Sequence, residues 1–270
     1  MKIDLQKTQQ IMLIIVLGLL ALSMVLLLTT SAYGAFADRA PSCNVADLKL
    51  YGGLVYYPKE GLSSGATADQ TAAESIRHQI EAADADPGIK AILLQIDSPG
   101  GDPVAGEDIA SALRHATKPT VALVADEGDS AAYWAATGAQ TIFASANSSL
   151  ADIGVTESYL DQTKQDAANG LTFVSLTAGK YKDMGNPDSP LTSAERVILL
   201  RDLNITMQNF ISDVAQNRGL SVASVTAIAN GSPMLGQMAL DDGLIDHIGT
   251  IYDVESFLKG KIGTSVTLCQ

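Results

Sequence analysis

The chain has 270 residues, room for one large domain or two small ones, and 47% of them are hydrophobic, which suffices for a sizeable core. Its formal net charge of -13 speaks against nucleic-acid binding, because phosphates are bound by lysine and arginine. No cysteines and histidines are grouped with the spacing of a metal site, and we expect neither a metal nor another cofactor.

The N-terminal part contains an uncharged, almost wholly apolar run at residues 11–28. Eighteen helical residues span about 27 Å, just enough to cross a bilayer. Lys2 and Lys7 precede the run, which predicts a cytoplasmic N-terminus and an exported remainder. A cleaved signal peptide is the alternative, because Ala35-Phe36-Ala37 has the small-x-small form of a cleavage site. The length of the run favours an uncleaved anchor.

The residues beyond the anchor predict strands that alternate with helices. Residues 29–47 are expected to be a linker, and residues 48–270 one domain. Strands are expected at 48–57, 90–96, 119–125, 139–144 and 171–176, and helices at 71–85, 103–116, from 130, 157–168, 192–218 and 222–230. Capping boxes are expected at Thr71 with Glu74 and at Thr192 with Glu195. This alternation predicts an α/β fold of βαβ units with a mostly parallel sheet.

Two strand-to-helix junctions carry candidate chemistry. Ser130 follows one buried strand and opens an apolar helix, so free backbone N–H groups would surround its hydroxyl. The alternative is that Asp129 or Ser130 only caps the helix. Gly100 and Gly101 follow another buried strand, and glycines there let a ligand approach the backbone. That turn could form an oxyanion hole, or serve only as a tight turn.

A serine nucleophile needs a general base. His78 and His115 fall on predicted amphipathic helices, and His247 lies near the C-terminus. The alternative is a lysine from the loop at 179–187, which contains Lys180 and Lys182. A lysine base must be neutral, which requires burial away from carboxylates.

Five ordered motifs resemble the signal peptide peptidase A (SppA) family. They are D-S-P-G-G at 97–101, S-x-x-Y-W at 130–134, I-G-V at 153–155, G-K-Y-K-D-M-G-N-P at 179–187 and L-D-D-G-L-I-D at 240–246. The resemblance covers residues 48–258. Members of this family are membrane-anchored Ser/Lys peptidases with a ClpP/crotonase-like fold.

The resemblance implies a role for four residues. Ser130 matches the nucleophile and Lys182 the general base, with Lys180 as a nearby lysine without that role. The amides of Gly101 and Ala131 match the oxyanion hole, with Gly100 as the less favoured donor. The family usually has two glycines after the serine, whereas this chain has Ala131 and Ala132. Alanine keeps the N–H, so this departure puts efficiency and specificity in question more than reaction type.

The resemblance and the anchor together imply a single-pass protein of the cytoplasmic membrane, with its catalytic domain on the periplasmic or extracytoplasmic side. Its substrates would be hydrophobic peptides such as remnant signal peptides. Homo-oligomers would share active sites between subunits. A catalytically silent scaffold and a crotonase-like acyl-CoA enzyme are the alternatives, because a fold alone does not fix a function.

The two cysteines, Cys43 and Cys269, stand at either end of the predicted domain. Both would be exported, and that compartment permits oxidation. Because the termini of one domain often lie close together, we expect an intrachain disulfide. Two free thiols or a bond between subunits are the alternatives.

Overall fold

Two strongly apolar strands form the centre of a largely parallel sheet in the computed structural model of the chain, which describes residues 43–57 and 70–269. The strands of the described residues are β1 (Val45–Tyr51), β2 (Gly53–Val55), β3 (Gln70–Ala72), β4 (Ala91–Ser98), β5 (Thr120–Asp129), β6 (Thr141–Ala144), β7 (Ser149–Ala151), β8 (Pro233–Leu235), β9 (His247–Ile248) and β10 (Leu268–Cys269). The helices are α2 (Ala73–Ala85), α3 (Pro103–His115), α4 (Ala131–Thr137), α5 (Thr163–Ala168), α6 (Ser193–Arg218), α7 (Val222–Ile228), α8 (Gly236–Asp241) and α9 (Ile251–Ile262).

The main sheet runs in the order β10-β1-β4-β5-β6-β9, and every neighbouring pair along this path is parallel. β7 pairs parallel with the end of β5 and antiparallel with β8. The predicted α/β class with a mostly parallel sheet is therefore confirmed. Parallel strands place all their carboxyl ends at one edge, which is where such folds build their sites.

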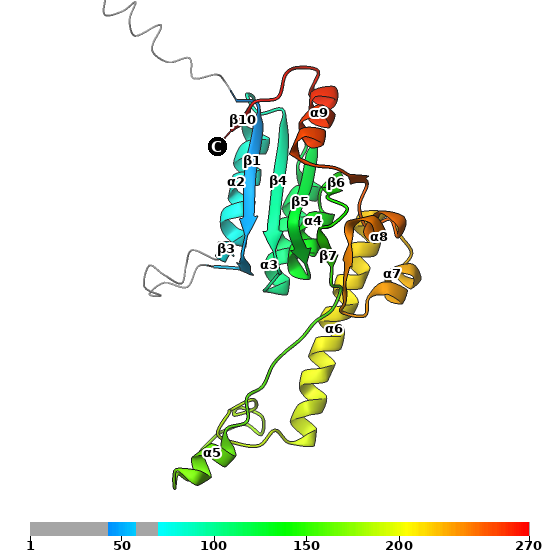
Figure 1. Ribbon diagram of the computed structural model, residues 1–270. Helices are drawn as coiled ribbons and strands as arrows, with labels where there is room; N and C mark the ends of the chain where they lie inside the picture. The colour runs from blue at the N-terminus through cyan, green and yellow to red at the C-terminus, as the bar shows by residue number, and fades with distance from the viewer. Residues whose placement is uncertain (1–42, 58–69, 270) are drawn as a thin grey trace, which may run out of the picture. The chain divides into compact units, whose positions relative to one another are not determined.

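Helices cover both faces of the sheet (Figure 1). Alternate residues of β4 serve the two faces: Ile92, Leu94 and Ile96 join the larger core with α2, α3 and α4, whereas Ala91 and Leu93 join the smaller core under α9. A strand buried on both faces needs a continuous apolar run, and this explains the composition of β4 and of the first half of β5.

α6 is docked only through its C-terminal half. Phe210 stacks on Trp134 of α4 with ring centroids 4.6 Å apart, and Trp134 Nε1 donates a hydrogen bond of 3.1 Å to Asp213. The buried residues of α6 are Phe210, Ile211, Val214 and Ala215. The capping box of Thr192 with Glu195 is confirmed, and Gly219 ends the helix in the left-handed conformation.

Three local predictions were wrong. Residues 171–176 form no strand, and the helix expected at 157–168 is only the short α5. No strand of the described chain pairs with this segment, and Leu176 is 95% exposed, so its apolar side chain is not covered there either. Thr71 does not cap α2; its hydroxyl instead bonds both the N–H and the carbonyl of Tyr51.

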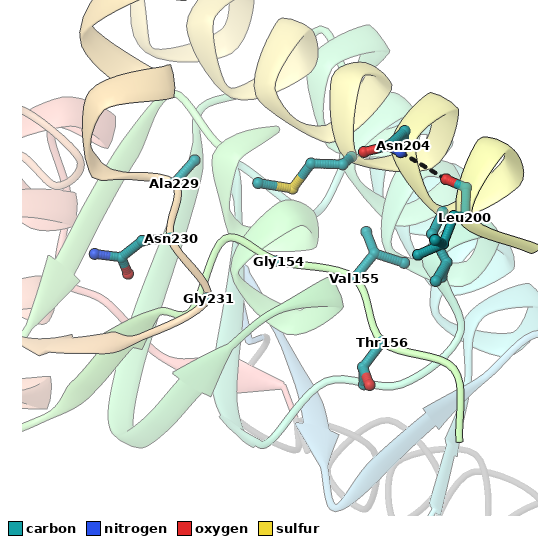
Figure 2. A pocket seen from close by; sticks show the side chains of 10 residues that line it. Gly154, Val155, Thr156, Leu200, Asn204, Ala229, Asn230 and Gly231 are labelled. Atoms are coloured by element: carbon teal, nitrogen blue, oxygen red, sulfur yellow. Dashed lines mark hydrogen bonds between the residues drawn. The ribbon is translucent and has the colours of Figure 1, made fainter. Parts of the chain in front are cut away.

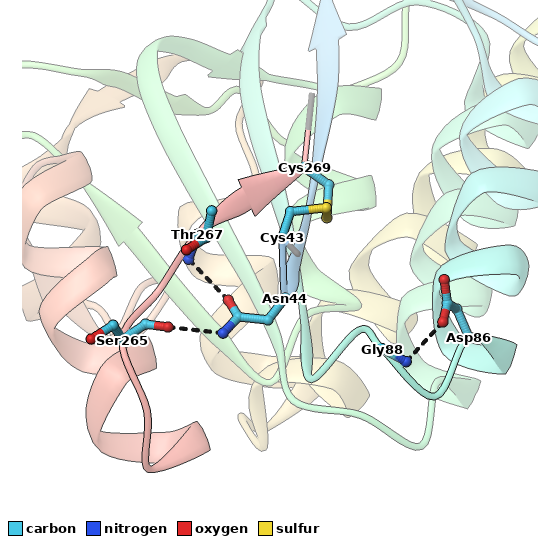
Figure 3. Close-up of a disulfide and its surroundings, with 7 residues drawn as sticks. All are labelled: Cys43, Asn44, Asp86, Gly88, Ser265, Thr267 and Cys269. Atoms are coloured by element: carbon cyan, nitrogen blue, oxygen red, sulfur yellow. Dashed lines mark hydrogen bonds between the residues drawn. A yellow bond between two sulfur atoms is a disulfide. The ribbon is translucent and has the colours of Figure 1, made fainter. Parts of the chain in front are cut away.

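The predicted disulfide is confirmed: Cys43 is bonded to Cys269, with the two Cα atoms 5.0 Å apart (Figure 3). Asn44 reinforces this closure, because its side chain donates to the carbonyl of Ser265 and accepts from the N–H of Thr267. The first and last strands of the sheet are thereby fastened side by side.

The predicted anchor at 11–28 and the candidate cleavage site at 35–37 lie outside the described residues. Within residues 43–57 and 70–269, no helix combines the length and the apolar character needed to cross a membrane.

Candidate active site

Ser130 lies at the junction of β5 and α4 in a strained backbone conformation. Its φ of 53° and ψ of -124° are rare outside glycine and cost about 1–3 kcal/mol. Two hydrogen bonds hold it there: its N–H donates to Ala151 at 2.7 Å, and its carbonyl accepts from Trp134 at 3.0 Å. The side chain makes no capping hydrogen bond and is partly exposed, so the hydroxyl is available for chemistry.

The Gly100–Gly101 turn follows β4 and requires both of its glycines. Gly100 has a φ of 94°, and a side chain at Gly101 would lie 2.0 Å from the carbonyl oxygen of Leu54. The buried hydroxyl of Ser98 supports the turn, since it donates to Gly52 at 2.6 Å and accepts from the N–H of Gly100 at 3.1 Å. The turn is therefore fixed by close backbone packing and by hydrogen bonds.

The structure brings this turn against Ser130. A Cβ on Gly100 would lie 2.8 Å from Ser130 Cβ and 2.9 Å from Ala131 N, so the segments are in direct contact. Ala131 is the first residue of α4, where an N–H has no partner inside the helix. Within the described chain the N–H of Gly101 also makes no hydrogen bond, whereas that of Gly100 is taken by Ser98. Two unpaired N–H groups beside a hydroxyl can stabilise an oxyanion.

An acidic group lies behind the serine. Asp129 is 6% exposed; its Oδ2 accepts a 2.7 Å hydrogen bond from Ser149, and its Oδ1 is buried without a partner. Burial raises the pKa of Asp129 and of Asp152, and both burial and the charge of Asp129 raise the pKa of Glu127. These carboxyl groups therefore hold protons more tightly than exposed ones do.

An apolar pocket begins beside the serine. Ser130 and Trp134 line a small recess together with Gly154 and Val155. The same Gly154 and Val155 also line a larger pocket against α6, where Leu200, Leu203 and Met207 supply apolar side chains. Figure 2 shows Val155 facing the Leu200 region of α6 across this pocket, with Asn204 at its side and Asn230 at its far end. Such a shape suits an apolar side chain near a reactive serine.

The structure does not bring Lys182 to Ser130 within the chain. Lys182 is exposed in a turn between α5 and α6. This segment is closed on itself just before the N-terminal end of α6: the N–H of Gln162 donates to Pro187, and the Tyr159 hydroxyl donates to Asn186. In Figure 1, α5 lies beyond that end of α6, away from the sheet. Thr192 precedes the docked Phe210 by eighteen residues, about 27 Å along a helix.

Some supporting residues escaped the sequence analysis. One of them is Ser98 of the D-S-P-G-G motif, whose hydroxyl stabilises the Gly100–Gly101 turn by hydrogen bonds. A serine at the end of an apolar strand could have indicated this role. The pairing of Asp129 with Ser149 depends on the contact of β5 with β7, for which the sequence offers no signal.

Comparison with known proteins adds an independent finding. The family model described as Peptidase family S49 matches residues 112–263, and the model described as Clp protease matches residues 57–151. Together the two matches include the Gly-Gly turn, Ser130 and Lys182.

The similar individual proteins come from distant organisms. "Putative protease MJ0651" of Methanocaldococcus jannaschii is 34% identical over 62% of this chain and 55% of its own length. The chloroplastic serine protease SPPA of Arabidopsis thaliana is 27% identical over 78% of this chain and 31% of its own length. Protease 4 of Haemophilus influenzae is 26% identical over 66% of this chain and 29% of its own length. The chain thus spans about half or less of the length of these relatives.

Proposed function

This chain belongs to peptidase family S49, because the model of that family matches 152 of the 270 residues of the chain, and we propose that the protein is a serine endopeptidase with a Ser130/Lys182 dyad. The resemblance to the SppA family agrees with this membership, since Protease 4 and SPPA proteins are among its relatives. The observation that carries the proposal is the contact of the Gly100–Gly101 turn with Ser130 and Ala131.

The proposed reaction is acyl transfer. Lys182 Nζ, in its neutral form, takes the proton of the Ser130 hydroxyl while Oγ attacks the peptide carbonyl. The N–H groups of Gly101 and Ala131 bind the negative oxygen of the tetrahedral intermediate. Its collapse breaks the C–N bond, and the lysine returns the proton to the departing amine. Water, deprotonated by the same lysine, then attacks the acyl-enzyme; the ester C–O bond breaks, and the lysine passes the proton to Ser130 Oγ and is neutral again.

The lysine in this proposal comes from another subunit. Within one chain Lys182 belongs to a segment held about 27 Å along α6 from the contact with Trp134. The same segment exposes Leu160, Leu171, Val174 and Leu176, which is unusual for a monomer. A second copy that covers these side chains would at the same time deliver its lysine to Ser130 of the first. The match to the Clp protease model is in keeping with such a homo-oligomer.

The proposed substrates are apolar peptides, such as remnant signal peptides. The pocket between Val155 and α6 supports this choice, because Leu200, Leu203 and Met207 offer no charge to a substrate side chain. We also propose that residues 11–28 anchor the chain in the cytoplasmic membrane with the catalytic domain outside. The Cys43–Cys269 disulfide supports an oxidising compartment.

A fluorophosphonate probe tests the catalytic assignment directly, because it reacts only with an activated serine. The wild-type chain should label at Ser130 and cleave apolar peptides, and Ser130→Ala should do neither while it unfolds at an unchanged urea concentration. Ser149→Ala is the matched control, since that serine bonds Asp129 and is not assigned to the reaction. An assembled wild-type protein that does not label would be the silent scaffold instead.

A further inference from the structure

We propose that Gly106 is a positioning residue of the oxyanion hole: by lacking a side chain, it lets α3 hold the Ala131 peptide at a fixed place relative to Gly101. This inference rests on the proposed function, because it assumes that the N–H groups of Gly101 and Ala131 bind the oxyanion.

The contact at Gly106 is made by backbone atoms alone. A Cβ there would lie 2.4 Å from the carbonyl oxygen of Ala131 and 3.1 Å from both its carbonyl carbon and its Cα. Carbon atoms in contact prefer separations of about 3.5–4.0 Å, so a methyl group would displace the Ala131 backbone by an amount on the order of 1 Å. No flexible side chain is available to absorb this displacement.

α3 links both halves of the hole. It begins at Pro103, two residues after Gly101, and its next turn carries Gly106 against Ala131. On the opposite side, Gly100 closes on Ser130 and on the nitrogen of Ala131. Ala131 is therefore wedged between the turn and the helix. A displacement of the Ala131 backbone away from Gly106 would change the separation of the two N–H groups, which must lie about 2.7–3.1 Å from the oxyanion.

Nothing else in the local structure calls for glycine at this position. Gly106 lies inside a regular helix and has no positive φ. Glycine is the poorest helix former after proline. The close approach to Ala131 accounts for it.

Gly138 provides a matched control at the other end of the same helix pair. A Cβ there would lie 2.1 Å from the carbonyl oxygen of Ala110, a residue one turn beyond Gly106 on α3. Its φ of -71° and ψ of -18° suit alanine. Gly138 follows Ala131 by seven residues, about 10 Å along a helix. Gly138→Ala therefore disturbs the packing of α3 and α4 without contact with Ala131.

The experiment compares the full chain carrying Gly106→Ala or Gly138→Ala with wild type, at low temperature in sucrose to favour the folded state. It measures kcat and KM on an apolar peptide, the inhibition constant of a peptide aldehyde, and the affinity for the product peptide. The aldehyde forms a hemiacetal with Ser130 whose oxygen occupies the oxyanion hole, whereas the product makes no such oxyanion.

We expect Gly106→Ala to lower kcat roughly 10- to 100-fold, somewhat less than complete loss of one oxyanion donor. KM and the affinity for the product should stay within about threefold, and aldehyde inhibition should weaken in parallel with kcat. Gly138→Ala should retain the wild-type kcat and aldehyde affinity.

Equal kcat values for the two variants, or a loss that falls on KM, would overturn the proposal. A Gly106→Ala chain that does not fold would also overturn it, because the glycine would then serve the fold itself. A wild-type protein without activity or probe labelling would instead refute the proposed function, so the two failures are distinguishable.

Discussion

The Cys43–Cys269 disulfide should contribute a large share of the stability of the domain. It joins residues 226 positions apart, and closure of so long a loop removes much of the conformational entropy of the unfolded chain. The chain-entropy model gives about 5 kcal/mol for a loop of this length. The native closure would survive without the bond, because β10 still pairs with β1 and Asn44 still bonds Ser265 and Thr267. The loss should therefore come mainly from the unfolded state.

The assay is urea unfolding of the wild type and of Cys43→Ala/Cys269→Ala, each with and without reductant. The double variant should lose several kcal/mol, up to about 5, which corresponds to roughly 10–20 °C in melting temperature for a domain of this size. Reductant should lower wild type to the level of the variant and leave the variant unchanged. The single variants should match the double variant. A loss below about 1 kcal/mol, or a reductant effect on the double variant, would refute the reasoning.

Two further predictions concern charge. Lys182→Ala should reduce peptidase activity by several orders of magnitude while Lys180→Ala keeps most of it, as measured by initial rates on one peptide; the reverse order would contradict the assignment of the base. Burial raises the pKa of Asp129 in the folded state, so the folded chain binds the carboxyl proton of Asp129 more tightly than the unfolded chain does. The contribution of Asp129 to the free energy of unfolding therefore falls as pH rises from the unfolded pKa through the folded pKa. Asp129→Asn should thus raise the urea midpoint relative to wild type at pH 7 and not at pH 3, and an equal effect at both would speak against a raised pKa.

The parallel sheet could be predicted because its central strands are recognisable in the sequence. Residues 90–96 and 119–125 are continuous apolar runs, as burial on both faces demands, and each is followed by a helical segment. Adjacent parallel strands end at the same edge, and so the turns after β4 and β5 meet. The contact of the Gly100–Gly101 turn with Ser130 follows from this topology.

The segment between β7 and α6 could not be predicted in the same way. Residues 171–176 are as rich in apolar and β-branched side chains as a strand, yet Leu176 is almost fully exposed. The spacing of apolar residues indicates which side chains are to be buried. It does not indicate whether they are buried by the same chain or by a second subunit. The N-terminal half of α6 was predicted correctly as helix, but it too leaves apolar side chains uncovered, among them Val197 and Leu200.

The fine structure of the site depends on packing that no local pattern encodes. The role argued for Gly106 requires knowledge that α3 crosses α4 at Ala131, which only the folded structure reveals. Likewise, the positive φ of Ser130 is fixed by the carbonyl of Ala151, which belongs to a strand that the sequence did not predict.

The most direct test of the central claim is activity in mixed assemblies of Ser130→Ala and Lys182→Ala chains. Each variant alone should be inactive. After dissociation and reassembly in equal amounts, roughly a quarter of the sites should pair an intact serine with an intact lysine from a neighbour, if each site spans one heterologous interface. We therefore expect recovery of up to about a quarter of wild-type activity. Mixed assemblies whose subunits have demonstrably exchanged, and which still show no activity, would contradict a site shared between subunits.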